Sequence, residues 1–380
     1  MDKLLYISNI GGVTFNVGFC GTSMEACKKL EIEYHVVANR SKSNPQQMES
    51  DEREYGIHLY HADIHRFPLS QYNRKAYYQI LEIIRKEGID FIHCNTPVGG
   101  LLGRLCGKRA KVPKIIYTAH GFHFYKGAPL LNWLLYYPAE RWLAHYTDAL
   151  ITINREDYAA AQKFRLRRGG RVYYVPGVGV DTDAFSAVAD VRSKLLEEQK
   201  IPADALLLLS SGELNTNKNN ESILRALHEL QDPSIHYLIC GVGDLETPLK
   251  ALTTALGLES QVHFLGYRSD MKELLRAADI FVMPSLREGL SRSLMEAMAS
   301  GLPCLVSRIR GNVDLIEDGV GGYLYAPSDS KGFAEGIRRL LGSPELRVSM
   351  GQANLKTIQK YDVRVVEKQI EDIYREVLQA

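Results

Sequence analysis

The chain has 380 residues, a length that predicts two domains. Its 45% hydrophobic and 24% charged residues are typical of a folded globular protein and exclude a disordered chain. The formal net charge is +1, and no apolar run reaches the roughly 18 residues of a membrane-spanning helix. The amino-terminal segment lacks a signal-peptide pattern, so we expect a cytoplasmic protein.

Six cysteines are scattered without the paired spacing of a metal site. Cys94, Cys240 and Cys304 lie in or beside apolar, strand-like segments. We therefore expect buried free thiols in a reducing compartment, and no metal. The charge is uneven, with +6 over residues 1–183 and −5 over the remainder. A basic first half favours an anionic ligand or surface there, although such a value also falls within ordinary scatter.

The chain opens with a short strand over residues 3–8, followed by Gly11, Gly12 and a helix predicted to end at Leu30. This start is Rossmann-like but lacks the full G-x-G-x-x-G pattern, which argues against a dinucleotide site. The two glycines either let a ligand approach the backbone or form a plain tight turn. The polar residues 39–54 predict a loop.

His120 directly follows a predicted strand over residues 114–119. Ligands bind at the carboxyl ends of parallel strands, where a histidine can donate to a sugar hydroxyl or to an oxygen that gains charge. A histidine at such a place is also commonly a structural group.

Between residues 130 and 146 the sequence is rich in leucine and aromatic residues. The pattern fits either an interfacial helix that enters a bilayer or a core helix, and it does not distinguish them. Basic residues between Lys163 and Arg171 suit anionic headgroups or a diphosphate, or form a solvated face.

Glycine and proline between residues 176 and 179 predict a linker. A buried strand over residues 206–211 then begins a second α/β pattern. Lys218 stands in the loop before the next helix, where an ammonium group can neutralise a diphosphate. Most lysines, however, are simply exposed.

Residues 279–301 predict a strand, a loop and a helix. Amide groups at the helix start, near Leu290 and Ser291, suit a phosphate. Glu288 in the loop and Glu296 on the helix are poor phosphate ligands, so they suit the hydroxyls of a sugar or ribose. Each of them alone fits a solvated residue equally well.

The spacing of Glu288 and Glu296, followed by A-M-A-S-G-L-P, resembles the signature of family-four glycosyltransferases of the GT-B fold. The stretches H-C-N-T-P-V-G-G, Y-T-A-H-G-F-H-F-Y-K-G-A-P and L-L-Y-Y-P resemble the exopolysaccharide enzymes of the EpsD type, over nearly the whole chain. The resemblance implies two Rossmann-like domains whose parallel sheets face a central cleft. Residues 1–180 would bind the acceptor, residues 181–360 the nucleotide-sugar, and helix 361–380 would cross back to the first domain.

The resemblance also implies roles for individual residues. Glu288 and His120 would contact the donor sugar, Glu296 would hold the ribose, and Lys218 would neutralise the diphosphate, with catalytic roles for His120, Glu288 and Lys218. The other implied donor-binding residues are Gly11, Gly12, Tyr267, Arg268, Gly289, Leu290, Ser291 and Arg292. The wider family carries an arginine where this chain has Glu213. Our hypothesis is that Arg292 supplies the missing charge.

By resemblance, the protein is a retaining bacterial enzyme that moves a sugar from a UDP-sugar to a saccharide on a polyprenyl diphosphate, in exopolysaccharide or capsule synthesis. It would need no metal or other cofactor, and it would contact the inner face of the membrane peripherally through its first domain. One alternative is a UDP-sugar 2-epimerase of the same fold. Another is a non-catalytic sugar-nucleotide-binding protein, which Glu213 keeps open. No nucleic-acid partner is expected, because the basic residues are not interleaved with an aromatic platform.

Overall fold

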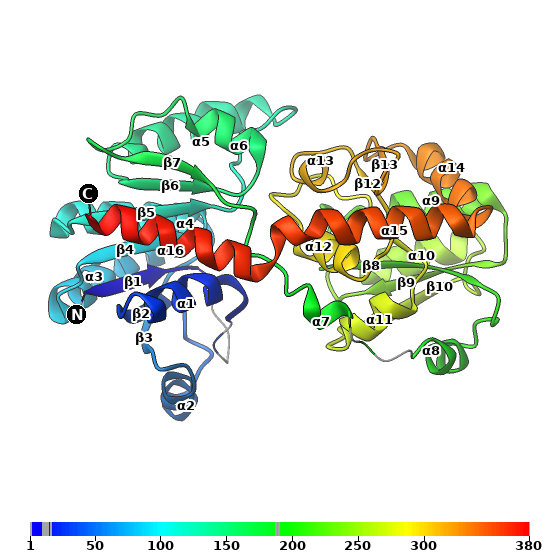
Figure 1. The fold of residues 1–380 in the computed structure, drawn as a ribbon, viewed down its shortest axis with the longest axis horizontal. Helices are drawn as coiled ribbons and strands as arrows, with labels where there is room; N and C mark the ends of the chain where they lie inside the picture. Colours follow the sequence, from blue (N-terminus) through cyan, green and yellow to red (C-terminus); the bar gives the residue numbers. More distant parts are fainter. Residues whose placement is uncertain (1, 10–14, 16, 187, 189–190, 380) are drawn as a thin grey trace. The chain divides into compact units, whose positions relative to one another are not determined.

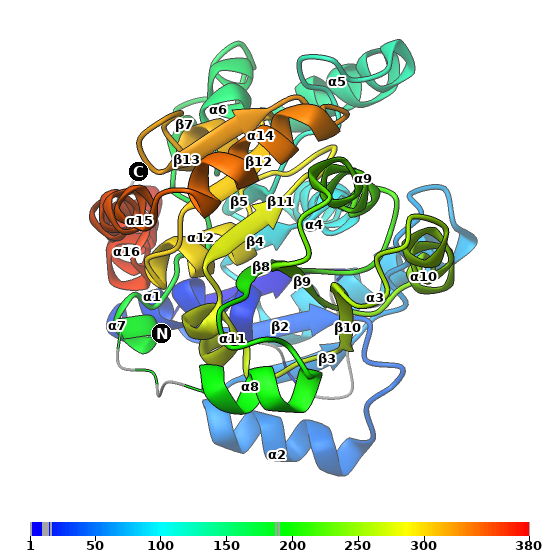
Figure 2. The same ribbon diagram turned by 90° about the vertical axis from the view of Figure 1, so that its right-hand side faces the viewer.

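The computed structural model describes residues 2–9, 15, 17–186, 188 and 191–379. The chain divides into two compact units: unit 1 is Met1–Gly179 with Val363–Ala380, and unit 2 is Val180–Asp362. The predicted boundaries after residues 180 and 360 differ from these limits by one and two residues. Each unit is built around a sheet of parallel strands with helices on both faces (Figures 1 and 2).

The described residues of unit 1 form a seven-stranded sheet. Its strands are β1 (Lys3–Ile7), β2 (Glu33–Ala38), β3 (His58–His61), β4 (Phe91–Asn95), β5 (Lys114–Ala119), β6 (Ala149–Thr152) and β7 (Arg171–Tyr174). The order across the sheet is β3-β2-β1-β4-β5-β6-β7, and neighbouring strands are parallel. The direction of the order reverses between β1 and β4. In open α/β sheets, ligands bind at the carboxyl ends of the strands at such a switch point.

Helices cover both faces of this sheet. They are α1 (Gly21–Lys29), α2 (Pro45–Tyr55), α3 (Gln71–Glu87), α4 (Pro97–Ala110), α5 (Leu130–Ala144), α6 (Arg155–Ala161) and α16 (Val363–Gln379). Ile80 of α3 and Leu102 of α4 enter the hydrophobic cluster on one face. Ala26 of α1 and Tyr374 of α16 enter the cluster on the other. The last helix of the chain is therefore part of the core of unit 1.

The prediction of a loop over residues 39–54 is wrong, because α2 occupies most of that segment. The Asn44 side chain accepts a hydrogen bond from Gln47 N at 2.7 Å, and Gly56 ends the helix in the left-handed conformation. Only Asp51 of this helix is buried, and it pairs with Arg40 at 2.8 Å. Met48 and Tyr55 are its only apolar residues packed against the core, and both are only partly buried, so the helix has little apolar stripe for a sequence pattern to detect.

The described residues of unit 2 form a six-stranded sheet in the order β10-β9-β8-β11-β12-β13, again parallel. The strands are β8 (Leu206–Ser211), β9 (Ile235–Cys240), β10 (Val262–Gly266), β11 (Ile280–Met283), β12 (Cys304–Ser307) and β13 (Gly322–Tyr325). The helices are α7 (Asp183–Ser186), α8 (Arg192–Gln199), α9 (Glu221–Leu230), α10 (Glu246–Ala255), α11 (Met271–Ala277), α12 (Arg292–Ala299), α13 (Asn312–Leu315), α14 (Ser330–Leu341) and α15 (Pro344–Ile358). The switch point lies between β8 and β11.

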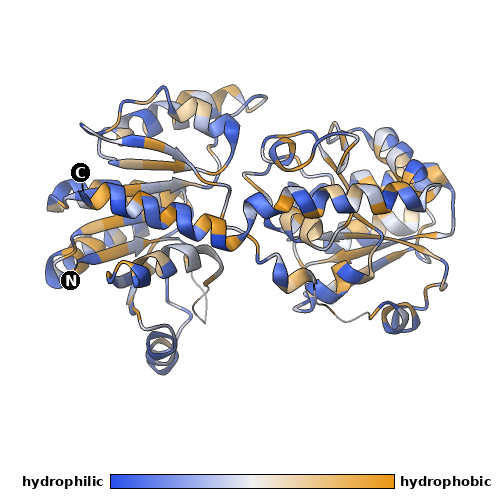
Figure 3. Ribbon diagram, viewed as in Figure 1, coloured by the Kyte–Doolittle hydropathy of each residue, from blue (hydrophilic) through white to orange (hydrophobic). Residues whose placement is uncertain are grey.

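The central strands of unit 2 are apolar on both faces, as a sheet covered by helices requires. Leu207, Leu208 and Leu209 of β8 are fully buried, and the strands appear mainly hydrophobic in Figure 3. Residues of α9, α10 and α14 pack on one face, and residues of α11 and α12 on the other. All six cysteines are free and buried, as predicted for the thiols themselves. Within the described ranges, every helix is too short or too polar to cross a bilayer.

Candidate active site

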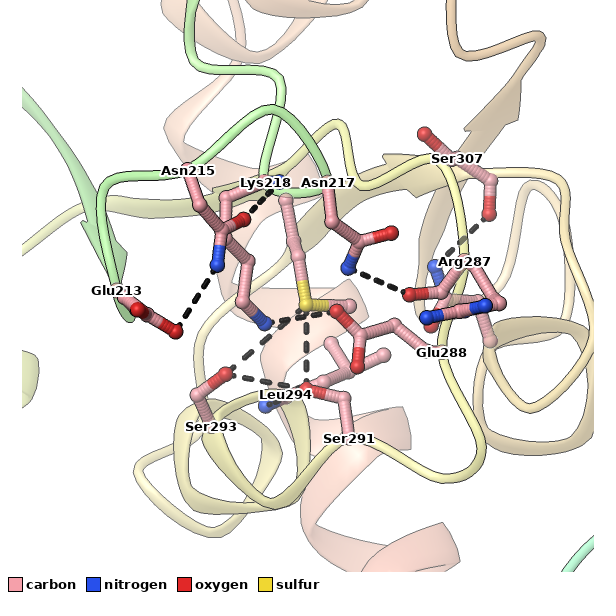
Figure 4. A network of polar contacts seen from close by, with 12 residues as sticks. Glu213, Asn215, Asn217, Lys218, Arg287, Glu288, Ser291, Ser293, Leu294 and Ser307 are labelled. Carbon is pink, nitrogen blue, oxygen red and sulfur yellow. Dashed lines mark hydrogen bonds and ion pairs between the residues drawn. The ribbon is translucent and has the colours of Figure 1, made fainter. Parts of the chain in front are cut away.

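The loops that follow β8 and β11 meet at the switch point of unit 2 (Figure 4). The first loop carries Lys218 and the second carries Glu288. Lys218 Nζ lies 2.7 Å from Glu288 Oε1, and their side chains are 21% and 14% exposed. The charges are thus partly screened from water but still reachable by a ligand. A cation and a carboxylate are presented together where α/β sheets bind ligands.

Two asparagines fasten these loops to each other. The Asn217 side chain donates to the Arg287 carbonyl at 2.9 Å, and Leu286 N donates to the Asn217 carbonyl at 2.8 Å. The Asn219 side chain donates to the Pro284 carbonyl at 3.0 Å. Asn219 has a φ of 53°, a left-handed conformation that asparagine tolerates better than most residues. The loop geometry around Lys218 is therefore set by hydrogen bonds to main-chain carbonyls as well as by the ion pair.

Helix α12 begins beside this ion pair. Ser291 is its N-cap, and its hydroxyl accepts a hydrogen bond from Leu294 N at 3.3 Å. In the next turn, Arg292 Nε donates to Glu296 Oε1 at 2.9 Å, and their side chains are 58% and 18% exposed. The helix start thus combines amide groups with a carboxylate that is paired with an exposed arginine.

The loop between β12 and α13 packs directly against the loop that carries Glu288. A Cβ added to Gly311 would lie 2.2 Å from the Gly289 carbonyl oxygen, and Gly311 has a φ of 82°. Only glycine fits such a position without strain. The neighbouring Arg310 is nearly buried, and its Nε donates to the Glu288 carbonyl at 3.3 Å. The backbone of Glu288 and Gly289 is therefore held in place by contacts with Arg310 and Gly311.

The other predicted residues of unit 2 are placed differently. Tyr267 and Arg268 follow the edge strand β10, two strands away from β8. Tyr267 is 80% exposed, and the Arg268 guanidinium forms an ion pair with Asp270. Glu213, at the position of the family arginine, is exposed and accepts a hydrogen bond from Asn215 at 3.0 Å. The structure thus gathers Lys218, Glu288 and the start of α12, while Tyr267 and Arg268 form a separate group.

In unit 1, His120 lies at the carboxyl end of β5 beside Asn95, the last residue of β4. His120 Nε2 lies 2.6 Å from Asn95 Oδ1. An amide oxygen only accepts, so Nε2 carries the proton. Burial lowers the pKa of His120 to about 4, so its ring is neutral at physiological pH. A neutral imidazole in one tautomer is suited to hydrogen bonding rather than to charge stabilisation.

Gly11 and Gly12 lie outside the described residues. Three residues that hydrogen-bond to predicted site residues or to their loops were not singled out from the sequence: Asn95, Asn217 and Asn219. Asn217 and Asn219 flank Lys218, so the repeated asparagines of N-T-N-K-N-N were the available signal. Their role depends on which strand neighbours β8, and a local pattern does not contain that information.

Two family models match the chain: "Glycosyltransferase Family 4" over residues 22–184 and "Glycosyl transferases group 1" over residues 191–357. The chain is 38% identical over 352 residues to EpsD of Bacillus subtilis (strain 168), whose name describes a glycosyltransferase, covering 91% of this chain and 90% of that one. It is 28% identical over 308 residues to the UDP-Gal:alpha-D-GlcNAc-diphosphoundecaprenol alpha-1,3-galactosyltransferase of Escherichia coli, covering 79% of each. Among solved structures, Anabaena Alr3699/HepE in complex with UDP and glucose superposes with a TM-score of 0.81 at 19% identity, covering 99% of this chain and all of that one.

Proposed function

Because the chain belongs to the family 4 glycosyltransferases of the GT-B fold and is thus an enzyme of glycan synthesis, we propose that its donor is a UDP-sugar and that its acceptor is a saccharide on a polyprenyl diphosphate. Transfer proceeds with retention of anomeric configuration and without a metal or other cofactor. The observation that carries the proposal is the Lys218–Glu288 pair at the switch point of unit 2.

Lys218 stabilises the departing diphosphate. The charge of the leaving group grows during transfer, and an ammonium already fixed beside it lowers the barrier without reorganisation. The donor's phosphate competes with Glu288 for Lys218, which frees the Glu288 carboxylate to accept hydrogen bonds from the sugar hydroxyls. The ion pair of the free protein therefore holds both groups in place until the donor replaces it.

Glu296 binds the ribose hydroxyls, and the start of α12 meets the phosphates. The guanidinium of Arg292 covers Glu296 in the free protein, at 2.9 Å. Its side chain is more than half exposed, so it can swing from Glu296 to the diphosphate when the ribose arrives. This movement supplies the second cation, which the wider family provides through an arginine at the position of Glu213. In unit 1, the neutral ring of His120 is suited to hydrogen-bond a sugar hydroxyl.

The acceptor assignment has two sources of support. The Escherichia coli relative is named for transfer to a sugar on diphosphoundecaprenol, and it matches most of this chain. A lipid-linked acceptor also requires the enzyme to reach a membrane surface, and α5 offers an apolar face. Its exposed residues at helical spacing are Leu131, Leu134, Leu135, Pro138 and Trp142.

Basic residues flank a contact that α5 makes with the rest of unit 1. Tyr137 of α5 packs on Phe164, which lies between the exposed Lys163 and Arg165. Leu134 is 63% exposed, although burying a leucine is worth about 1.5–3 kcal/mol. An apolar stripe with a cationic border matches an anionic bilayer surface. We propose that unit 1 contacts the inner face of the membrane through α5.

The experiment incubates the purified protein with a panel of UDP-sugars and polyprenyl-diphosphate-linked saccharides. Mass spectrometry should detect the acceptor gaining one hexose or N-acetylhexosamine, and the new linkage should keep the donor's anomeric configuration by NMR. UDP release should require the acceptor. Release without an acceptor, accompanied by an epimerised sugar, would instead identify the 2-epimerase. Donor binding without turnover on any acceptor would contradict the proposed reaction.

A further inference from the structure

A glutamate and two histidines converge at the edge of the unit 1 sheet, at the amino ends of its strands. Glu33 begins β2, His35 follows two residues later, and His58 begins β3 as the register partner of His35. Glu33 Oε1 lies 3.0 Å from His35 Nε2 and 3.1 Å from His58 Nε2. One ligand atom from each residue lies within 4.8 Å of the other two.

The inner histidine is held in one orientation. The His35 side chain is 1% exposed, and its Nδ1 lies 3.1 Å from the Tyr60 hydroxyl. The Tyr60 hydroxyl also forms a hydrogen bond with the Glu87 carboxylate, which can only accept. The Tyr60 oxygen then accepts from the Nδ1–H of His35, while its own proton is directed to Glu87. This leaves a lone pair on His35 Nε2.

That lone pair faces an acceptor. Among the described residues, His35 Nε2 has no hydrogen-bond partner, although Glu33 Oε1 is only 3.0 Å away. A nitrogen lone pair and a carboxylate oxygen at this separation repel each other unless a cation lies between them.

We propose that Glu33, His35 and His58 bind a zinc ion at the β2–β3 edge of unit 1. Ligand atoms around tetrahedral zinc lie about 3.3 Å apart, given zinc–nitrogen bonds of about 2.0–2.1 Å. The observed 3.0 and 3.1 Å separations are close to that value. Two imidazoles with one carboxylate suit zinc, whereas magnesium and calcium prefer oxygen ligands throughout.

Other features of the cluster agree with a metal site. His58 is half exposed, with 51% of its side chain accessible. This exposure gives the ion a path from solvent and lets a water molecule occupy the fourth coordination position. The His35–Tyr60 contact is the outer-shell hydrogen bond that orients ligating histidines. The ion would join β2 to the four-residue edge strand β3. The site lies toward the amino ends of β2 and β3, whereas His120 lies at the carboxyl end of β5, so the ion stabilises the fold and takes no part in transfer.

The test uses the full-length protein, stripped with EDTA, desalted and titrated with zinc chloride in competition with a chromogenic chelator. Wild-type protein should bind one zinc ion per chain. His58→Ala and Glu33→Gln should each weaken binding at least tenfold, the usual cost of a disturbed site. His61→Ala is the matched control, because His61 lies on the same strand and pairs instead with Asp63. It should bind zinc as wild type does.

A second readout is thermal unfolding. Zinc should raise the Tm of wild type and His61→Ala, but not that of His58→Ala or Glu33→Gln. Absence of zinc uptake by the wild type, or wild-type zinc affinity in both His58→Ala and Glu33→Gln, would overturn the proposal. His58→Ala should retain wild-type transfer activity. A failed zinc site is thereby distinguished from a failure of the proposed reaction.

Discussion

Lys218 Nζ lies 2.7 Å from Glu288 Oε1, although the two residues are 70 positions apart in the chain. Their contact exists because β8 and β11 are neighbours and both loops leave the same edge of the sheet. Catalytic groups that are in place before the substrate binds need no reorganisation during reaction. The pair therefore gives the sharpest test of the donor site.

Replacing Lys218 with alanine should lower kcat/KM by about 10²–10³-fold, because the departing diphosphate loses its fixed cation. Steady-state kinetics of UDP release with donor and acceptor measure the effect. Lys250→Ala is the control, since Lys250 is an exposed lysine that also pairs with a glutamate, Glu246. It should behave as wild type. Retention of more than a tenth of wild-type kcat/KM by Lys218→Ala would contradict the assigned role.

Arg292→Ala should weaken UDP binding about tenfold, equivalent to ~1.4 kcal/mol, if this arginine meets the diphosphate. Isothermal titration of UDP gives the affinity directly. Arg225→Ala is the control, because Arg225 is exposed and also pairs with a glutamate four residues away, Glu221, in the reverse order along the helix. Unchanged donor affinity and turnover in Arg292→Ala, beside their loss in Lys218→Ala, would show that Arg292 does not replace the family arginine.

His93 should make stability fall in acid. Its Nδ1 lies 2.5 Å from the Tyr374 hydroxyl. Burial, and to a smaller extent electrostatic repulsion from His120, lowers the pKa of His93 to about 3. Between about pH 6.5 and 3 the unfolded chain binds a proton that the folded chain does not. The free energy of unfolding therefore decreases as pH falls through this window, by about 1.4 kcal/mol per pH unit.

Thermal unfolding between pH 7 and 4.5 measures this dependence. The Tm of wild type should fall more steeply with acidification than the Tm of His93→Gln, which lacks the titrating group. His228→Gln, at an exposed histidine of α9, should follow the wild-type slope. Parallel curves for wild type and His93→Gln would exclude His93 as the source.

The ion pair of Arg104 with Glu140 should be costly to break. Arg104 is completely buried, lies 2.8 Å from Glu140 and stacks on the Tyr117 ring at 3.9 Å. Glu140→Gln leaves a buried charge without its counterion, a loss of about 3–5 kcal/mol by chemical denaturation. Replacing both partners, as Arg104→Met with Glu140→Leu, should cost less than Glu140→Gln alone. A loss below about 1 kcal/mol for Glu140→Gln would indicate that water reaches the arginine.

The apolar face of α5 should determine membrane binding. Wild-type protein should sediment with vesicles of phosphatidylcholine and phosphatidylglycerol, and the triple variant Leu131→Ser, Leu134→Ser, Leu135→Ser should remain in solution. Val348→Ser removes an equally exposed apolar residue, 61% accessible, from α15 and should bind vesicles as wild type does. Failure of the wild type to sediment with any lipid mixture would refute the contact.

Local patterns predicted much of this molecule. The strand, loop and helix over residues 279–301 follow from an apolar run, two chain-breaking residues and helical spacing, and the family and fold that they indicated are confirmed. The proximity of Lys218 and Glu288 depends on strand order, which no local window contains. The sequence did not assign α5 to the core or to a membrane surface, because apolar residues occur on all sides of this helix. Only the fold shows which of them face solvent. The cluster of Glu33 and His58 likewise depends on the register between β2 and β3.

Helix α16 packs with α1 against one face of the first sheet, yet it is encoded after the whole of unit 2. During translation the part of that face beneath α16 stays uncovered while the ribosome makes the intervening residues, on the order of ten seconds or more at ~5–20 residues per second. The middle of the polypeptide can therefore mature before the beginning does. A nascent chain in this state offers chaperones an apolar surface around Phe91 and Ile116, and a fragment ending at residue 179 would offer it permanently.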